Sequence, residues 1–152
     1  MNRKSGVLMH ISSLFGNYSI GGFGNEAKYF IDFLADCGYS CWQVLPFCPS
    51  DKWSSPYKSP SAFAGNPYFI SLQNLYKKGL LTDVELSCQK QFSPYVCEYE
   101  RLHNERLNVL KIASGRVTNK NEIETFVSQN PYIENFCRFM AIKKANSNKP
   151  WQ

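Results

Sequence analysis

The chain has 152 residues, of which 43% are hydrophobic and 15% aromatic, and its formal net charge is +5. This length and composition suffice for one packed domain of ordinary size, which excludes disorder for most of the chain. Lys and Arg are scattered, and the only adjacent pairs are Arg3-Lys4, Lys77-Lys78 and Lys143-Lys144. We therefore expect no nucleic-acid binding, and no apolar run is long enough to cross a bilayer.

The six cysteines lack the paired spacing of a zinc site, and no cleavable leader precedes them. They indicate free thiols in a reducing compartment, so we expect a cytoplasmic protein without a metal. Cys37 falls on the apolar face of a predicted helix and Cys41 opens a predicted strand. Both are expected to be small buried hydrophobic residues.

The first third of the chain predicts a strand, a helix and a second strand. Residues 5–14 (SGVLMHISSL) form an apolar run without alternation, which is typical of a parallel strand covered on both faces. Asn25 is a candidate cap for a helix that runs to Cys37 and ends at Gly38. A second apolar run at residues 40–47 completes a βαβ unit with two parallel strands and a right-handed crossover.

Between the first strand and the helix, residues 22–27 fit the pattern G-x-G-x-x-A of a dinucleotide fingerprint. The fit is weak, because Gly22 comes eight residues after Leu14 and the second strand ends without an acidic residue. Flexible turn glycines are the favoured interpretation, and a nucleotide-dependent enzyme stays an alternative that a thermal shift with NAD or ATP would test.

After Pro46 the sequence predicts about 35 residues of loop, with a brief strand at 68–72 and a short helix ended by Gly79. The last third predicts helices at 98–114, 122–129 and 132–145, the second with a capping-box-like start at Asn121 and Glu124. The last helix carries an apolar stripe that is expected to be core: Ile133, Phe136, Cys137, Phe139 and Met140.

Two histidines are candidates for chemistry. His10 lies near the carboxyl end of the first strand, the edge at which parallel α/β folds build their sites, although a hydrogen-bonded structural histidine is the more common case. His103 lies in a polar helical stretch and is expected to be solvated. Two histidines give no Ser-His-Asp order and no metal cluster.

The loop after the second strand has an unusual composition. Residues 54–69 (SSPYKSPSAFAGNPYF) combine three prolines, which fix the backbone, with Gly65, which permits a tight turn. The loop should be stiff. It offers hydroxyl groups beside aromatic rings, a combination that suits a sugar: the residues concerned are Ser55, Ser59, Ser61, Tyr57 and Trp53.

A simpler interpretation of this loop is a proline-stiffened segment whose aromatic residues fill a satellite core. Both interpretations are expected to hold in part. Phe63 and Tyr68 would then plug the core, with Phe63 buried, and Tyr57 would be exposed to ligand.

Four segments, SGVLMHISSL, FIDFLADCGYSCWQVLPF, SSPYKSPSAFAGNP and FMAIKKANSNKPW, together resemble the 4-alpha-glucanotransferases, also called amylomaltases or disproportionating enzymes. The resemblance implies an α/β fold, the amino-terminal part of an elaborated (β/α)8 TIM barrel. Residues 1–50 would form its first βαβ unit, residues 51–80 a substrate-binding loop with a short strand and helix, and residues 81–152 a helical insertion. Two strands leave such a sheet unfinished, so the chain is expected to be a truncated part of a larger protein.

The family resemblance also implies an activity. Members transfer a segment of an α-1,4-glucan to the 4-hydroxyl of an acceptor glucan or glucose by a retaining double displacement, without a cofactor. The expected partners are α-1,4-glucans and maltooligosaccharides, with no nucleic acid and no membrane. The catalytic carboxylates are expected beyond residue 152, so the 152 residues alone should be inactive. The alternative is a stand-alone α-glucan-binding module.

Carried over by position, Tyr57 matches the tyrosine of the family's S-P-Y motif, which lines the donor site, and Ser55 matches its serine. Trp53 lies beside the place of a tyrosine that binds glucan at a second site in some members, a place that Lys52 occupies here. Phe15 stands where members often have proline. The acidic residues Asp32, Asp36 and Asp51 match no catalytic position, and the first two are expected on the solvated face of their helix.

Overall fold

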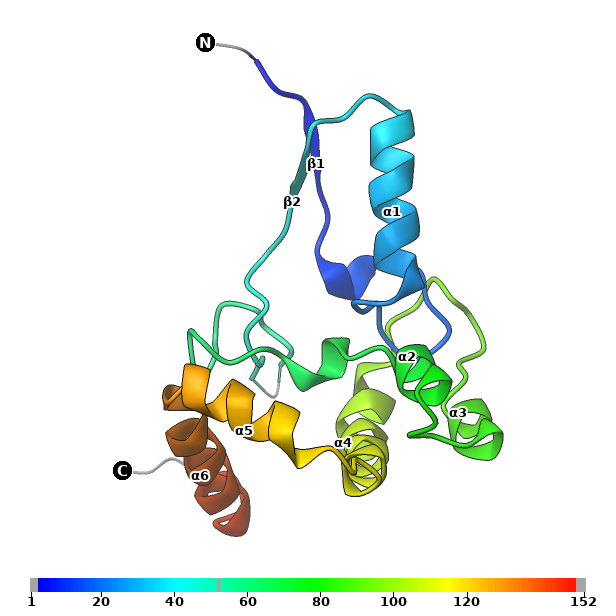
Figure 1. Cartoon of the computed structure of the whole chain (residues 1–152). Coiled ribbons are helices and arrows are strands. Elements are labelled where there is room, and N and C mark those ends of the chain that lie inside the picture. Colours follow the sequence, from blue (N-terminus) through cyan, green and yellow to red (C-terminus); the bar gives the residue numbers. More distant parts are fainter. Residues whose placement is uncertain (1–2, 52, 150–152) are drawn as a thin grey trace.

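The structure, a computed structural model, describes residues 3–51 and 53–149. Strand β1 (Gly6–Leu8), helix α1 (Asn25–Asp36) and strand β2 (Cys41–Gln43) form a βαβ unit. The strands pair in parallel with Gly6 opposite Cys41, and α1 lies alongside the pair (Figure 1). The remaining helices lie beyond the carboxyl ends of the two strands, where the chain folds back on itself. The predicted parallel strands and crossover helix are confirmed.

Both strands are shorter than the sequence predicts. Strand β1 covers only residues 6–8 of the expected strand 5–14, and Ile11–Ser13 turn into a 3-10 helix. The second strand covers 41–43 rather than 40–47. The expectation of cover on both faces was also wrong for this chain, since Leu8 is exposed.

Helix α1 ends as predicted, with Gly38 in the left-handed region at φ +75°. Its cap is Gly24 rather than Asn25, which is the first helical residue. Cys37 and Cys41 are exposed, contrary to the expectation of burial. All six cysteines are free thiols, as expected.

The glycines before α1 serve close packing rather than flexible turns. A Cβ on Gly21 would lie 2.2 Å from the carbonyl oxygen of Ile11, and one on Gly22 would lie 2.9 Å from that of Phe69. The neighbouring Phe23 N–H donates to the Phe69 carbonyl oxygen at 2.9 Å. Gly22, the first glycine of the fingerprint pattern, is therefore packed closely against the backbone of Phe69.

The expected strand at 68–72 is absent from the described chain. Pro67–Phe69 form a 3-10 helix instead, because Asn66 caps it by accepting from the Tyr68 N–H and Pro67 fits its first turn. Helix α2 (Leu72–Lys77) follows and ends before Gly79, as predicted. Helix α3 (Asp83–Cys88) was not predicted, although Thr82 and Glu85 form a full capping box.

The three last helices match the sequence expectations closely: α4 (Tyr99–Gly115), α5 (Lys120–Gln129) and α6 (Tyr132–Ala145). The start of α5 is capped by Asn119, which accepts from the Asn121 N–H, and not by an Asn121–Glu124 box. No helix within the described residues is long and apolar enough to cross a membrane.

Two hydrophobic cores hold the chain together. The first joins the βαβ unit to the 3-10 helix at 67–69 and to the first half of α4, and its buried residues include Ile11, Phe69 and Leu102. The second joins α2 and α3 to the end of α4 through Leu72, Leu86 and Ala113. Helix α4 therefore contributes to both cores.

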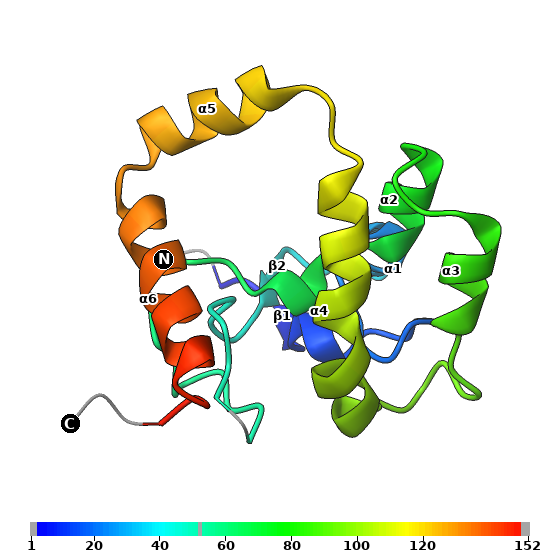
Figure 2. The same cartoon turned by 90° about the horizontal axis from the view of Figure 1, so that it is seen from below.

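Helices α5 and α6 contribute no buried side chain, although the structure describes all of their residues. Seen from below, they form an arm that leads away from α4 and returns beside the loop after β2 (Figure 2). The apolar stripe on α6 was expected to be core, but Cys137 and Phe139 are exposed. The other three residues of the stripe, Ile133, Phe136 and Met140, are only partly buried.

Candidate functional site: the loop between Phe47 and Asn66

The loop after β2 is closed at its base. The Asn66 N–H donates to the Phe47 carbonyl oxygen at 2.8 Å, and the Cys48 thiol contacts the Ala62 carbonyl oxygen at 3.3 Å. Because β1 and β2 are parallel, this loop and the segment after β1 leave the same edge of the sheet. That edge is where parallel α/β proteins bind ligands.

Asp51 organises the first turn of the loop. Its carboxylate oxygen Oδ1 accepts from the backbone N–H groups of Trp53 and Ser55, both at 3.0 Å. This arrangement is an Asx turn, and it brings Ser54 to φ +60°, which a non-glycine residue adopts only where its surroundings hold it. Asp51 was not expected in this role, although an Asp followed by serines is the usual signal for such a turn.

His103 anchors the same turn to α4. Its Nε2 lies 3.1 Å from the Ser54 hydroxyl, and its ring stacks on Tyr68 with 5.5 Å between centroids. The expectation of a solvated histidine was wrong, because the loop folds back over this helix. No local sequence signal links residues 49 positions apart.

The sugar-site candidates differ in exposure. Tyr57 is 71% exposed and Trp53 is 74% exposed. Ser55 is half-buried and is fixed through its backbone. Lys52, the alternative match to the second-site tyrosine, lies outside the described residues. The structure places Trp53 and Ser55 in the Asx turn and Tyr57 in the turn that follows it on the same loop. The exposure predicted for Tyr57 is confirmed.

Phe63 was expected to be buried but is 77% exposed. Its ring lies 5.8 Å from that of Tyr132 on α6, whose hydroxyl donates to the Phe63 carbonyl oxygen at 3.3 Å. Tyr68, the other residue expected to fill a satellite core, is partly buried and packs against the first core. Gly65 also differs from expectation: its φ is not positive, so the turn does not require glycine there.

Two of the hydroxyl groups proposed for sugar binding are used inside the loop. The Ser59 hydroxyl donates to the Ser61 carbonyl oxygen at 2.7 Å, and the Ser61 hydroxyl accepts from the N–H groups of Phe63 and Ala64. These serines shape the loop rather than present hydroxyls to a ligand.

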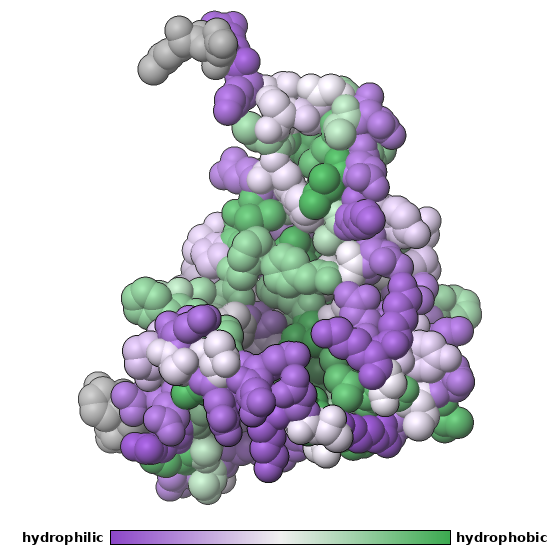
Figure 3. Space-filling model, in the orientation of Figure 1, coloured by the Kyte–Doolittle hydropathy of each residue, from purple (hydrophilic) through white to green (hydrophobic). Residues whose placement is uncertain are grey.

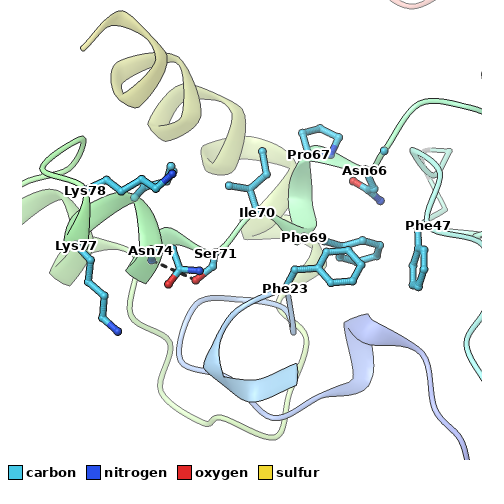
Figure 4. A pocket seen from close by; sticks show the side chains of 12 residues that line it. Phe23, Phe47, Asn66, Pro67, Phe69, Ile70, Ser71, Asn74, Lys77 and Lys78 are labelled. Atoms are coloured by element: carbon cyan, nitrogen blue, oxygen red, sulfur yellow. Dashed lines mark hydrogen bonds between the residues drawn. The ribbon is translucent and has the colours of Figure 1, made fainter. Parts of the chain in front are cut away.

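Beside the base of the loop lies a wide apolar groove with a volume of about 700 Å³. Phe23, Phe47 and Phe69 gather at one end, and Lys77 and Lys78 lie at the other (Figure 4). The Phe23 and Phe47 rings meet edge to face at 5.1 Å. Apolar residues are concentrated on the same face of the molecule, between the strand pair and the lower helices (Figure 3).

One charged side chain near the loop, that of Arg106, is buried. Arg106 on α4 is 2% exposed and donates to the carbonyl oxygens of Tyr18 and Tyr68. Burial lowers the pKa of Arg106 to about 10, so it stays charged at neutral pH. Burial also raises the pKa of Glu26. Hydrogen bonds from the N–H groups of Glu26 and Gly22 and the positive charge of Arg106 lower this pKa, but by less than burial raises it. The sequence pattern singled out neither residue.

The sequence assigns no catalytic role to any carboxylate of this chain. Asp32 and Asp36 are exposed on α1, as expected. Asp51 is engaged in its turn. Within the described residues, no group of three or more His, Cys, Asp or Glu side chains is arranged to hold a metal ion.

Comparison with known proteins agrees with this geometry. The profile of the 4-alpha-glucanotransferase family, glycoside hydrolase family 77, matches residues 9–152. The chain belongs to this family. It is 41% identical over 155 aligned residues to the 4-alpha-glucanotransferase of Streptococcus pneumoniae and 37% identical over 156 to that of Thermus thermophilus. These alignments cover 98% of the chain and 30% of each relative.

A solved structure gives the same result for the fold. The amylomaltase from Streptococcus agalactiae in complex with acarbose superimposes with a TM-score of 0.90 at 35% identity, over 97% of this chain and 31% of that one. The chain therefore spans about 30% of the length of the relatives that it matches. Its two parallel strands and helices correspond to an amino-terminal portion of the amylomaltase fold.

Proposed function

We propose that the chain provides part of the glucan-binding surface of a 4-alpha-glucanotransferase, an enzyme that moves a segment of an α-1,4-glucan to the 4-hydroxyl of another glucan or of glucose. The observation that carries the proposal is the closed loop at the carboxyl edge of β1 and β2, which holds Trp53 and Tyr57 exposed on successive turns. Family membership and the acarbose complex of the solved neighbour support it. The substrates would be α-1,4-glucans and maltooligosaccharides.

In this proposal Tyr57 stacks on the apolar face of a glucose unit, and Ser55 and Trp53 precede it in the Asx turn. Stacking suits Tyr57, because a ring held by an ordered turn loses little freedom on binding. The Lys58 N–H closes the turn of Tyr57 by donating to the Ser55 carbonyl oxygen at 3.4 Å. Free cysteines throughout the chain support a reducing, cytoplasmic location for the protein.

Transfer with retention needs two carboxyl groups about 5 to 5.5 Å apart, one as nucleophile and one as acid and base. We place that pair outside these 152 residues, since Asp32, Asp36 and Asp51 match no catalytic position and the chain spans about 30% of its relatives. The 152-residue chain incubated with maltotriose should therefore give neither glucose nor longer maltodextrins. Appearance of both products would contradict this placement.

Binding can be tested separately from catalysis. Titration calorimetry of the chain with maltotriose should show an affinity that Tyr57→Ala lowers about tenfold, the loss of one stacking contact. Tyr95→Ala is the matched control, because Tyr95 is 85% exposed on a different loop. Equal affinity of the two variants would contradict the role of Tyr57. Cooperative unfolding together with strong affinity would favour a stand-alone binding module.

A further inference from the structure

His10 lies at the same sheet edge as the proposed glucan loop. Only Met9 separates it from the end of β1, and the Met9 N–H donates to the Gln43 carbonyl oxygen at 3.0 Å. Its imidazole stacks on Phe47 with 6.3 Å between centroids and meets Phe69 edge to face at 5.4 Å. These two rings come from the two ends of the segment that carries the loop, so His10 is held in a fixed orientation.

The two nitrogens of this imidazole have different surroundings. Nδ1 is buried and has no hydrogen-bond partner among the described residues. A neutral imidazole carries its proton on one nitrogen, and a buried N–H without an acceptor is rarer in proteins than an unpaired acceptor. The proton therefore belongs on Nε2. Burial also lowers the pKa of His10, which keeps the ring neutral. His10 is thus a neutral donor through Nε2–H.

A cavity of about 210 Å³ adjoins this ring. Its wall combines apolar side chains, among them Ile20, Leu45 and Leu102, with hydroxyl and amide side chains that include Ser12, Ser50, Ser54, Asn66 and Tyr99. Because a water occupies about 30 Å³ in the liquid, the cavity has room for more than a few waters. No Asp, Glu, Lys or Arg among the described residues lines it. Its chemistry suits an uncharged ligand rich in hydroxyl groups, rather than a phosphate or a carboxylate.

The cavity borders the loop that carries the proposed glucan site. Ser54 and Pro56 form part of its wall, and they flank Ser55 in the sequence that leads to Tyr57. The Ser54 hydroxyl is fixed by His103, so this wall is an ordered part of the structure.

We propose that His10 is a glucan-binding residue that donates a hydrogen bond from Nε2 to a hydroxyl of a glucose unit in this cavity. The inference rests on the proposed function, but it assigns a residue and a donor atom that the loop and the family membership leave unassigned. A purely structural His10 would fill the same space between Phe47 and Phe69 without contacting substrate.

Two substitutions separate these roles. His10→Phe keeps a ring between Phe47 and Phe69 but removes the donor, whereas His10→Gln keeps an N–H near the place of Nε2 but removes the ring. In calorimetric titrations with maltotriose, His10→Phe should lose affinity about fivefold to tenfold while its melting temperature is unchanged. His10→Gln should melt lower and keep most of its affinity. Full affinity of His10→Phe would overturn the proposal.

Imidazole nitrogen resonances of the unaltered chain give a second readout. Long-range ¹H–¹⁵N spectra should show His10 as the neutral Nε2–H tautomer, and its Nε2 signal should move when maltotriose is added. A shift of the Tyr57 ring signals without a shift at His10 would overturn the role of His10 alone. Absence of both shifts would overturn the proposed function as well. An Nδ1–H tautomer, or a ring averaged by disorder, would also contradict the proposal.

Discussion

At the scale of single residues, the glycines before α1 and in the loop have opposite roles. Gly21 is buried, and a Cβ there would meet backbone oxygens of Ile11 and Leu14 at 2.2 and 2.8 Å. Gly65 has no heavy atom of another described segment within 4 Å of such a Cβ. Close contact with backbone cannot be relieved by a rotamer change, so only the first position requires glycine.

We therefore expect Gly21→Ala to lower the free energy of unfolding by about 3 kcal/mol or more, as overpacking against rigid backbone does. Gly65→Ala should raise it by about 0.5 kcal/mol, because alanine restricts the unfolded chain. Urea unfolding of the two variants measures both. Similar stabilities for the two variants would show that the contacts around Gly21 can relax.

The ion pair between Glu85 and Arg116 ties the start of α3 to the end of α4, at 2.6 and 2.8 Å. Hydrogen bonds from Arg116 hold the pKa of Glu85 at about 2, below its usual 4.5. As the pH falls, the Glu85 carboxylate takes up a proton near pH 4.5 in the unfolded chain but only near pH 2 in the folded chain. The ion pair therefore stabilises the fold fully above pH 4.5, and its contribution is lost as the pH falls through about 2.

Glu85→Gln tests this pH dependence, because glutamine keeps the capping box with Thr82 but does not ionise. The melting temperature of the parent chain should exceed that of the variant at pH 7. The difference should shrink from pH 4.5 downwards and vanish near pH 2. A difference that stays constant over this range would mean that the Glu85 charge contributes nothing to stability.

At the scale of elements, periodicity predicted most helices and little of the loop. Helices α1, α4 and α6 have long apolar faces, and their predicted ends lie within one residue of the observed ones. The run Tyr68-Phe69-Ile70 was taken for a strand, because its apolar residues do not show that Asn66 and Pro67 start a 3-10 helix. Exposure of Phe63 depends on which segments pack over it, which no local pattern specifies.

Site residues also divide into those that the sequence predicts and those that it does not. The S-P-Y motif located the turn of Tyr57 and Ser55, and the structure keeps it at the sheet edge. Of the residues that hold this loop, His103 acts through a contact between distant segments, which no local pattern shows. Asp51 acts through a local turn, which the sequence pattern did not single out.

Helices α5 and α6 should open more readily than α4. None of their side chains, all of which are described, is buried, whereas α4 contributes Leu102, Arg106 and Ala113 to the interior. Hydrogen exchange should therefore be about a hundredfold or more faster for amides of α5 and α6 than for residues 102–113. Equal protection would contradict this, and would indicate that the stripe on α6 is covered in solution.

At the scale of the whole molecule, two cores form within the chain while the sheet keeps only two strands. An eight-stranded barrel has about 250 residues, so these 152 residues cannot close one. The division into residues 1–50, 51–80 and 81–152 stays a prediction. What the chain does build is one ordered edge, at which the loop from Phe47 to Asn66 meets His10 and α4.

Intermolecular nuclear Overhauser effects between maltotriose and the 152-residue chain test the glucan role of this edge most directly. Sugar C–H protons should give cross-peaks to the Tyr57 ring and none to the equally exposed Tyr95. Cross-peaks to Phe23 and Phe47 in the apolar groove without any to Tyr57, or no cross-peaks at concentrations that saturate binding, would contradict the assignment of the loop as a glucan site.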